Sequence, residues 1–171
     1  REALASLHNG RERTILMKER IKEILCVVLL VLFIVFISSE SKISTKSADE
    51  VFEGVKSSMD LSALSKQKSK KFEEELSLSA DKYEDIIYYA SASVMEVREL
   101  LIVKLRDTAD KDELISAAEK RAEEKTKLFE GYAPKEGALL KNHVLLEKNG
   151  FVLFAVCDEP LKVSAAFKSI V

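Results

Sequence analysis

The chain of 171 residues contains no tryptophan, two histidines, two cysteines, two prolines and five glycines. Two cysteines are too few for a disulfide scaffold or for a zinc site with four thiolate ligands. Five glycines leave little room for loops that cradle phosphates, and the sequence has no Walker loop, dinucleotide-binding fingerprint or Gly-x-Ser-x-Gly elbow. These absences exclude the motifs by which several large enzyme classes are recognised.

The charge of the chain is close to balanced, with 27 basic and 29 acidic side chains and a formal net charge of −2. This balance removes the electrostatic case for binding nucleic acid. The composition, 47% hydrophobic and 33% charged, excludes collagen-like and wholly disordered classes. At this length we expect one folded domain with short additions.

One long apolar run divides the chain. The residues from Ile24 to Ile37 include no polar side chain, and a helix that is apolar on every face belongs in hydrocarbon rather than in the core of an ordinary soluble domain. As a helix the run measures about 21 Å, and the two serines after it bring it near the lower limit for crossing a bilayer. We predict that residues 24–39 form a transmembrane helix or, since a run of this length also suits a secretory signal, a signal helix that is cleaved.

Close to this run, basic residues lie mainly on its N-terminal side. Within about 15 residues before it stand Arg11, Arg13, Lys18, Arg20 and Lys22, against Lys42 and Lys46 over a similar span after it. The positive-inside rule therefore places residues 1–23 in the cytoplasm, with Met17 as a candidate for the true start, and exports the rest of the chain. Residues 40–47 predict a polar linker. Residues 48–171 predict an extracytoplasmic domain with 19 Lys and Arg against 24 Asp and Glu, a net charge of −5.

The exported part shows alternating helical and strand patterns. Apolar spacing predicts a short helix over 48–59 and a weaker one over 66–76, and β-branched and aromatic residues predict strands over 86–90 and 97–106. Asp110 and Glu113 resemble a capping box, which predicts a long helix that ends at Gly131, with Pro134 in the loop that follows.

Asn149-Gly150 gives the clearest local signal, because two apolar runs flank a pair of residues that tolerate the positive φ of a hairpin turn. We predict a hairpin over 143–157, followed by a helix that begins at Pro160. Two ββα units, 85–131 and 143–171, then predict an α+β domain with a four-stranded antiparallel sheet and helices on one face.

Few side chains suit catalysis or metal binding. His8 precedes the apolar run, His143 starts a predicted strand, and the chain has no His pair or Cys-x-x-Cys to supply converging metal ligands. Cys157 is typical of a small buried hydrophobic residue. The acidic runs 73–75 and 123–124 splay apart on a helix and predict solvated faces. We therefore assign no catalytic, cofactor-binding or metal-ligating residue.

The order of these features resembles the bacterial family catalogued as domain of unknown function 4358. The residues that carry the resemblance are Tyr83, the strand 99–104 followed by Asp107, Ala118, Arg121, Phe129, Tyr132-Ala-Pro134, Asn142 and 150–158. The resemblance covers about residues 48–171 and implies a small exported protein of Gram-positive bacteria, anchored to the membrane or carried as a lipoprotein. The lipobox cysteine of the lipoprotein members is absent, which favours a helical anchor. The family brings no known activity or cofactor, and Tyr132-Ala-Pro134 and Asn142 are interpreted as fixing a loop.

We expect a non-catalytic binding or scaffolding domain at the cell envelope, held in the membrane through Ile24 to Ile37 with its C-terminal domain outside the cytoplasm, or secreted after signal cleavage. Tyr88 and Tyr89 place one ring on each face of the sheet, and the face without helices is open to a protein partner or a second copy. Two alternatives are a secreted enzyme whose serine or carboxylate site is assembled by the fold, and a sensory domain that signals through its anchor.

Overall fold

The computed structural model describes residues 20–22, 24–32 and 43–171, which belong to two units, Arg1–Glu40 and Ser41–Val171. In the first unit, residues 24–32 are helical and exposed. No helix among the described residues is long and apolar enough to cross a membrane. The predicted apolar segment lies partly outside the described residues, and Met17 and His8 lie outside them entirely.

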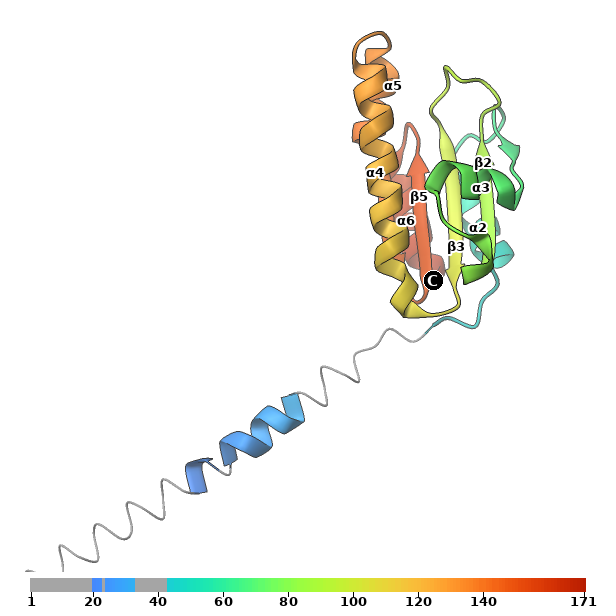
Figure 1. Ribbon diagram of the computed structural model, residues 1–171. Coiled ribbons are helices and arrows are strands. Elements are labelled where there is room, and N and C mark those ends of the chain that lie inside the picture. The colour runs from blue at the N-terminus through green and yellow to red at the C-terminus, as the bar shows by residue number, and fades with distance from the viewer. Residues whose placement is uncertain (1–19, 23, 33–42) are drawn as a thin grey trace, which may run out of the picture. The chain divides into compact units, whose positions relative to one another are not determined.

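The second unit alternates helices and strands (Figure 1). In chain order they are α2 (Ala48–Val55), β1 (Ser65–Lys66), α3 (Ser69–Leu76), β2 (Tyr83–Ala90), β3 (Glu99–Leu105), α4 (Lys111–Glu130), α5 (Pro134–Lys141), β4 (Val144–Lys148), β5 (Phe151–Val156) and α6 (Pro160–Ile170). Short 3-10 turns precede β1, β2 and α4. The α+β class predicted from the sequence is confirmed.

The sheet has five antiparallel strands in the order β1-β2-β3-β5-β4. All four predicted strands are present, but the predicted count is wrong, because β1 pairs with the end of β2 and adds an edge strand. This strand has two residues, Ser65 and Lys66, and both are exposed. A pair of polar residues carries no alternation of apolar and polar side chains, so the sequence gives no signal for it.

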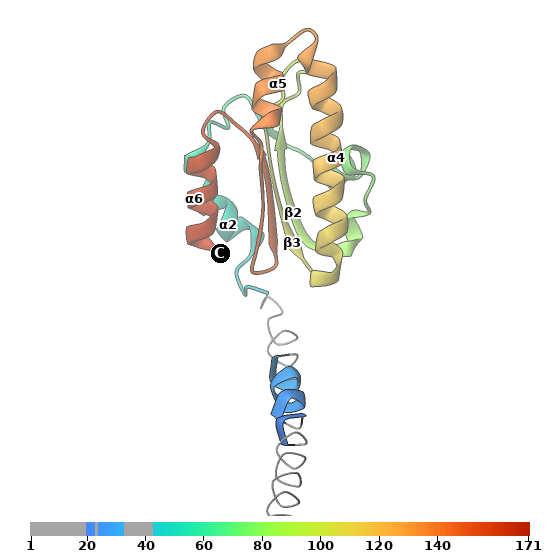
Figure 2. The same cartoon turned by 90° about the vertical axis from the view of Figure 1, so that its left-hand side faces the viewer.

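Helices cover both faces of the sheet, so the prediction that they lie on one face is wrong (Figure 2). Buried residues of α3, α4 and α5 pack on one face, and those of α2 and α6 pack on the other. The physical reason lies in β3 and β5, whose residues are all buried and therefore need cover on both sides. Tyr88 and Tyr89 do point to opposite faces, but Tyr89 stacks on Phe52 of α2 with ring centroids 4.9 Å apart. The open face expected for a partner is therefore covered.

The starts of two helices differ from expectation. The capping box predicted at Asp110 and Glu113 is wrong, because Asp110 makes no side-chain cap and Glu113 instead pairs with Lys82 at 2.6 Å. A 3-10 turn that runs directly into α4 leaves no extended residue there to act as a cap. The reciprocal capping box occurs at α2, between Ser47 and Glu50.

The segment after α4 is a helix rather than the predicted loop. Pro134 occupies the first turn of α5, where its missing N–H costs no hydrogen bond, so this proline begins a helix. Asn142 follows the last residue of α5, and its side-chain amide donates to the Ala138 carbonyl at 3.0 Å. Gly131 ends α4 as predicted.

The β4–β5 hairpin is confirmed, with φ values of 51° at Asn149 and 81° at Gly150. The described chain of the second unit starts beside this turn. The Ser44 amide donates to the Asn149 carbonyl at 2.7 Å, and a Cβ on Gly150 would lie 2.9 Å from Ile43 Cγ2. The chain therefore enters the second unit at the end of the sheet that holds the hairpin turn.

Candidate functional site

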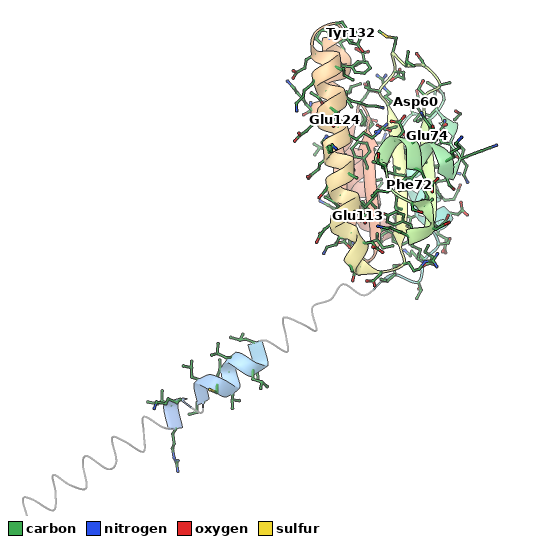
Figure 3. All side chains as sticks on the ribbon, viewed as in Figure 1. Asp60, Phe72, Glu74, Glu113, Glu124 and Tyr132 are labelled. Carbon is green, nitrogen blue, oxygen red and sulfur yellow. The ribbon has the colours of Figure 1, made fainter. Side chains whose placement is uncertain are left out.

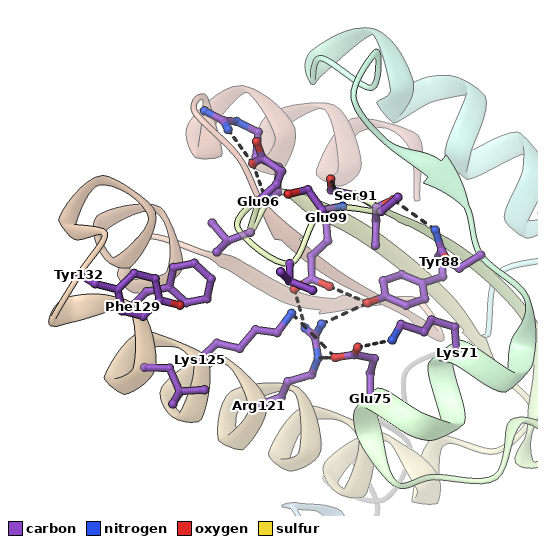
Figure 4. Close-up of a pocket in the computed structure, with 18 residues that line it drawn as sticks. Lys71, Glu75, Tyr88, Ser91, Glu96, Glu99, Arg121, Lys125, Phe129 and Tyr132 are labelled. Carbon is purple, nitrogen blue, oxygen red and sulfur yellow. Dashed lines mark hydrogen bonds and ion pairs between the residues drawn. The ribbon is translucent and has the colours of Figure 1, made fainter.

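A pocket of about 420 Å³ lies at the other end of the sheet, where β2 ends and β3 begins (Figure 4). Its walls are the β2–β3 loop, residues 91–98, the last turns of α3 and the C-terminal half of α4. The hairpin turn at Gly150 pairs beside Leu105 at the opposite end of β3. With seven residues in β3, the pocket and the point of chain entry are separated by about 20 Å of sheet.

Arg121 of α4 and Glu99 of β3 form the floor of the pocket. The guanidinium donates to the Glu99 carboxylate at 2.5 Å, and the two residues expose 8% and 2% of their surface. Tyr88 of β2 completes the floor, because its hydroxyl donates to Glu99 at 2.8 Å and accepts from Arg121 at 3.1 Å. Each of these three buried side chains is thus hydrogen-bonded to the other two, as a buried ionic cluster requires.

Glu75 of α3 brings further cations to the same floor. Its carboxylate accepts from Arg121 Nε at 2.8 Å and pairs with Lys71 at 2.8 Å and Lys125 at 3.8 Å. Burial acts to raise the pKa of Glu75, but the hydrogen bond from Lys71 and the charge of Arg121 outweigh it and lower the pKa to about 2. Glu75 therefore stays ionised at neutral pH.

The same neighbours set the charge of the remaining groups. Burial acts to lower the pKa of Arg121, but the adjacent Glu99 carboxylate outweighs this effect and raises the pKa, so the guanidinium stays charged. Burial and the charge of Glu99 raise the pKa of the Tyr88 hydroxyl, which stays neutral. Burial lowers the pKa of the Lys125 ammonium group, and the charge of Glu99 opposes that effect only in part.

The local sequence explains why these side chains meet. Arg121, Lys125 and Leu128 stand at spacings of four and three on α4, so one helix face carries all three. Glu99 and Leu101 are two residues apart on β3, so both point to the face of the sheet that packs against α4. Antiparallel pairing of β2 with β3 places Tyr88 opposite Leu101 and so next to Glu99 on that face.

Apolar side chains surround the mouth of the pocket. Val94 in the β2–β3 loop is 87% exposed, and Leu128 near the end of α4 is 66% exposed. Tyr132, which follows the end of α4 (Figure 3), is 58% exposed. Phe129 lies behind them, buried, with its ring centroid 5.2 Å from that of Tyr132. The pocket thus combines a charged floor with an apolar rim.

This arrangement can fix and orient a bound group. Both carboxylates on the floor are paired with cations, and the lowered pKa of Glu75 disfavours proton donation by that group. No histidine in the described part of the chain lines the pocket. Ser91 and Ser93 line it, and each hydroxyl accepts from a backbone amide, at 3.0 and 3.3 Å. Among the residues that the structure describes, no three His, Cys, Asp or Glu side chains are grouped so that they could hold a metal ion.

Sequence reasoning placed some of these residues correctly and missed others. Glu123 and Glu124 are solvated as predicted, but the solvated face predicted for residues 73–75 is wrong at Glu75, which points to Arg121 (Figure 4). The signal for Glu75 was its place three residues after Phe72, which anchors α3 on the sheet.

Two cysteines and a histidine are not among the residues that line the pocket. Cys157 is buried as predicted, and Cys26 is exposed in the first unit. His143, predicted to start a strand, lies one residue before β4, which begins at Val144, and its Nδ1 lies 2.7 Å from the Leu140 carbonyl oxygen. Glu99 and Arg121 belonged to the pattern of the family resemblance, without a role, and the fold places them in contact.

The second unit is an α+β domain with a five-stranded antiparallel sheet and a mixed-charge pocket at one end of that sheet. The family model described as "Domain of unknown function (DUF4358)" matches residues 57–157, which include every residue that lines the pocket. The chain belongs to this family, as the resemblance implied. No curated protein and no solved structure matches the chain.

Proposed function

We propose that this chain is a membrane-anchored, extracytoplasmic protein whose α+β domain binds a ligand, without catalysis, in the pocket between the β2–β3 loop and α4. The observation that carries the proposal is the buried floor of Arg121, Glu99 and Tyr88 beneath an exposed apolar rim. Ligand sites commonly combine apolar walls with a few fixed polar groups, and a volume of about 420 Å³ suits a small molecule or the end of a peptide.

Preorganisation of the floor supports a binding role. Arg121 is held by Glu99, Tyr88 and Glu75, so little conformational entropy remains to be lost when a ligand contacts the pocket. The exposed rim supports it as well, because large apolar side chains gathered around one opening mark a contact surface more often than chance exposure does.

The path of the chain supports the placement outside the cell. The apolar run and the basic residues before it predict an anchor with the domain exported.

The point of chain entry also suits a tethered binding domain. The chain joins the second unit beside Ile43, and the pocket lies at the opposite end of the sheet from Ile43. A domain tethered through that end would leave the mouth of the pocket unobstructed by the tether.

Binding is tested on the full chain purified in detergent. Backbone amide resonances of residues 91–98 and 121–132 are followed by NMR while a collection of small molecules and short peptides is added. We expect shifts confined to these segments, weakened by Leu128→Ser and unchanged by Leu161→Ser, a matched control on α6 that is also exposed. A collection that shifts neither segment would overturn the binding proposal.

Location is tested on intact cells that express the full chain. External protease should digest the second unit without lysis, and fractionation should recover the undigested chain with membranes. Protection from protease until the cells are lysed would overturn the placement outside the cytoplasm.

A further inference from the structure

The balance of charge on the floor of the pocket identifies the chemistry of its ligand, an inference that rests on the proposed binding function. We infer that the pocket selects molecules that join a single carboxylate to an apolar group, with the Lys125 ammonium group pairing with the carboxylate and the rim covering the apolar part.

The floor carries one more positive charge than negative charges. Lys71, Arg121 and Lys125 supply three cations, whereas Glu75 and Glu99 supply two carboxylates, which leaves a surplus of one positive charge. A second cluster at the edge of the pocket shares no printed ion pair with the floor: Arg98 pairs with Glu96 and with Asp158, which does not line the pocket, both at 2.7 Å. An anion would therefore bring the floor to neutrality.

Lys125 is the cation placed to receive that anion. Its ammonium group approaches Glu75 at 3.8 Å, beyond hydrogen-bond distance, whereas Lys71 and Arg121 both contact that carboxylate at 2.8 Å. The side chain of Lys125 is 30% exposed and points into the pocket from α4, while that of Arg121 is 9% exposed and committed to the floor (Figure 4). Burial lowers the pKa of Lys125, and a bound carboxylate would restore it.

The amount of surplus charge favours a carboxylate over a phosphate. A carboxylate carries one negative charge and balances the surplus, whereas a phosphate monoester with two charges would leave one negative charge uncompensated beside Glu75 and Glu99. Like charges in a partly buried site repel strongly, so the second charge would weaken binding. The cluster is thus matched in charge to a monoanion.

The rim supplies the apolar half of the site. Leu128 follows Lys125 by three residues on α4, so the two side chains share a helix face and a ligand can contact both. Val94 faces the same opening from the β2–β3 loop, and Tyr132 extends the apolar surface beyond the end of α4. A ligand whose carboxylate reaches Lys125 would therefore place its adjacent group between these side chains.

The test compares matched ligands by calorimetry on the full chain in detergent. N-acetylphenylalanine carries both groups, its amide lacks the charge, N-acetylglycine lacks the apolar group, and phenyl phosphate carries two charges. We expect the acid to bind about tenfold or more tightly than each of the other three, the difference typical of a charged hydrogen bond or a buried aromatic ring. Equal affinity for the acid and its amide would overturn the inference and leave the proposed binding function intact.

Variants of Lys125 test whether its ammonium group is the one that pairs with the ligand carboxylate. Lys125→Gln should lower affinity for the acid about tenfold and leave affinity for the amide unchanged, and Lys125→Arg should retain the preference for the acid. Lys120→Gln, on the exposed face of the same helix, should change neither affinity, and circular dichroism checks that each variant is folded. An acid preference that survives in Lys125→Gln would overturn the role of Lys125.

A final arm separates a free small acid from the end of a peptide. Ala-Ala-Phe and its C-terminal amide are compared with the two acetylated ligands, and tighter binding of the peptide acid would assign the source as a chain terminus. If none of these ligands binds, the carboxylate inference fails, while the proposed binding function fails only if the wider collection also leaves the pocket resonances unshifted.

Discussion

The guanidinium of Arg121 and the carboxylate of Glu99 meet 2.5 Å apart between a helix and a strand, although both residues are almost entirely withdrawn from water. Charges in such a place are tolerated only when they are paired and hydrogen-bonded. The pair therefore ties α4 to the first residue of β3 and, through Tyr88, to β2. This connection fixes the floor of the pocket to a strand whose residues are all buried.

Breaking this pair on one side should be costly. We expect Arg121→Met to lower the free energy of unfolding by about 3 to 5 kcal/mol, because it leaves the Glu99 carboxylate buried with only the Tyr88 hydroxyl as a partner. Glu99→Leu should cost less, because Arg121 keeps its ion pair with Glu75. The double variant should lose less than the sum of the single variants, since no unpaired charge remains. Urea denaturation of the full chain measures all three, and additive losses would show that the pair is not coupled.

The control for this cycle is an exposed pair on the same helix. Lys127 approaches Glu123 at 4.0 Å with both side chains mostly exposed, so Lys127→Met should change the free energy of unfolding by less than about 1 kcal/mol. A loss as large as that of Arg121→Met would mean that any charge removed from α4 has this effect.

Two tyrosines of β2 offer a matched comparison of hydroxyl groups. The Tyr88 hydroxyl donates to Glu99 and accepts from Arg121, whereas the Tyr83 hydroxyl is buried with no hydrogen-bond partner among the described residues. We expect Tyr88→Phe to cost about 1 to 3 kcal/mol, and Tyr83→Phe to be neutral or stabilising, because it removes an unsatisfied polar group. Burial raises the pKa of Tyr83 to about 12, so its hydroxyl is neutral in both measurements. Equal losses in the two variants would contradict the assigned hydrogen bonds.

The low pKa of Glu75 makes stability depend on acid pH. The folded-state pKa of about 2 lies below the ordinary value of 4.5, so the ionised form stabilises the fold fully above pH 4.5, and this contribution is lost as pH falls from 4.5 toward 2. The contribution is on the order of 1 to 3 kcal/mol. Unfolding free energies measured by urea titration over this range should fall less steeply for Glu75→Gln than for the parent chain. Parallel pH profiles would contradict the lowered pKa.

The sequence predicted the strands with strong patterns and the helices with clear boundaries. β3 and β5 stand out as apolar runs. The pair Asn149-Gly150 predicted the hairpin between β4 and β5, because both residues tolerate the positive φ of its turn. The same runs held the evidence against a sheet covered on one side, because strands without polar alternation need cover on both faces. An apolar run identifies a buried strand, but it does not identify the helices that cover the second face.

The site was harder to predict, because its members come from four separate elements. Arg121 and Glu99 are 22 residues apart, and Glu75 is 46 residues from Arg121, so neither pairing shows in local spacing. The register of β2 on β3 and the packing of α3 beside α4 bring them together. A spacing of four residues puts Arg121 and Lys125 on one face of α4, but charged residues on a helix usually face solvent, and only the fold shows that this face meets Glu99.

The hairpin turn and the entering chain offer a final test, in which conformation and packing are separated. Gly150 has φ of 81°, and a Cβ there would lie 2.9 Å from Ile43, so we expect Gly150→Ala to lower the free energy of unfolding by about 1 to 3 kcal/mol. Gly131→Ala is the matched control: it has negative φ and no atom within 4 Å of the added Cβ, and should be neutral or stabilising. Adding Ile43→Ala to Gly150→Ala removes the steric contact but not the backbone strain. Because the strain remains, Gly150→Ala should still lower the free energy of unfolding when it is added to Ile43→Ala, but by less than it does in the parent chain. If Gly150→Ala has no effect in the Ile43→Ala background, Gly150 is required for space rather than for its φ.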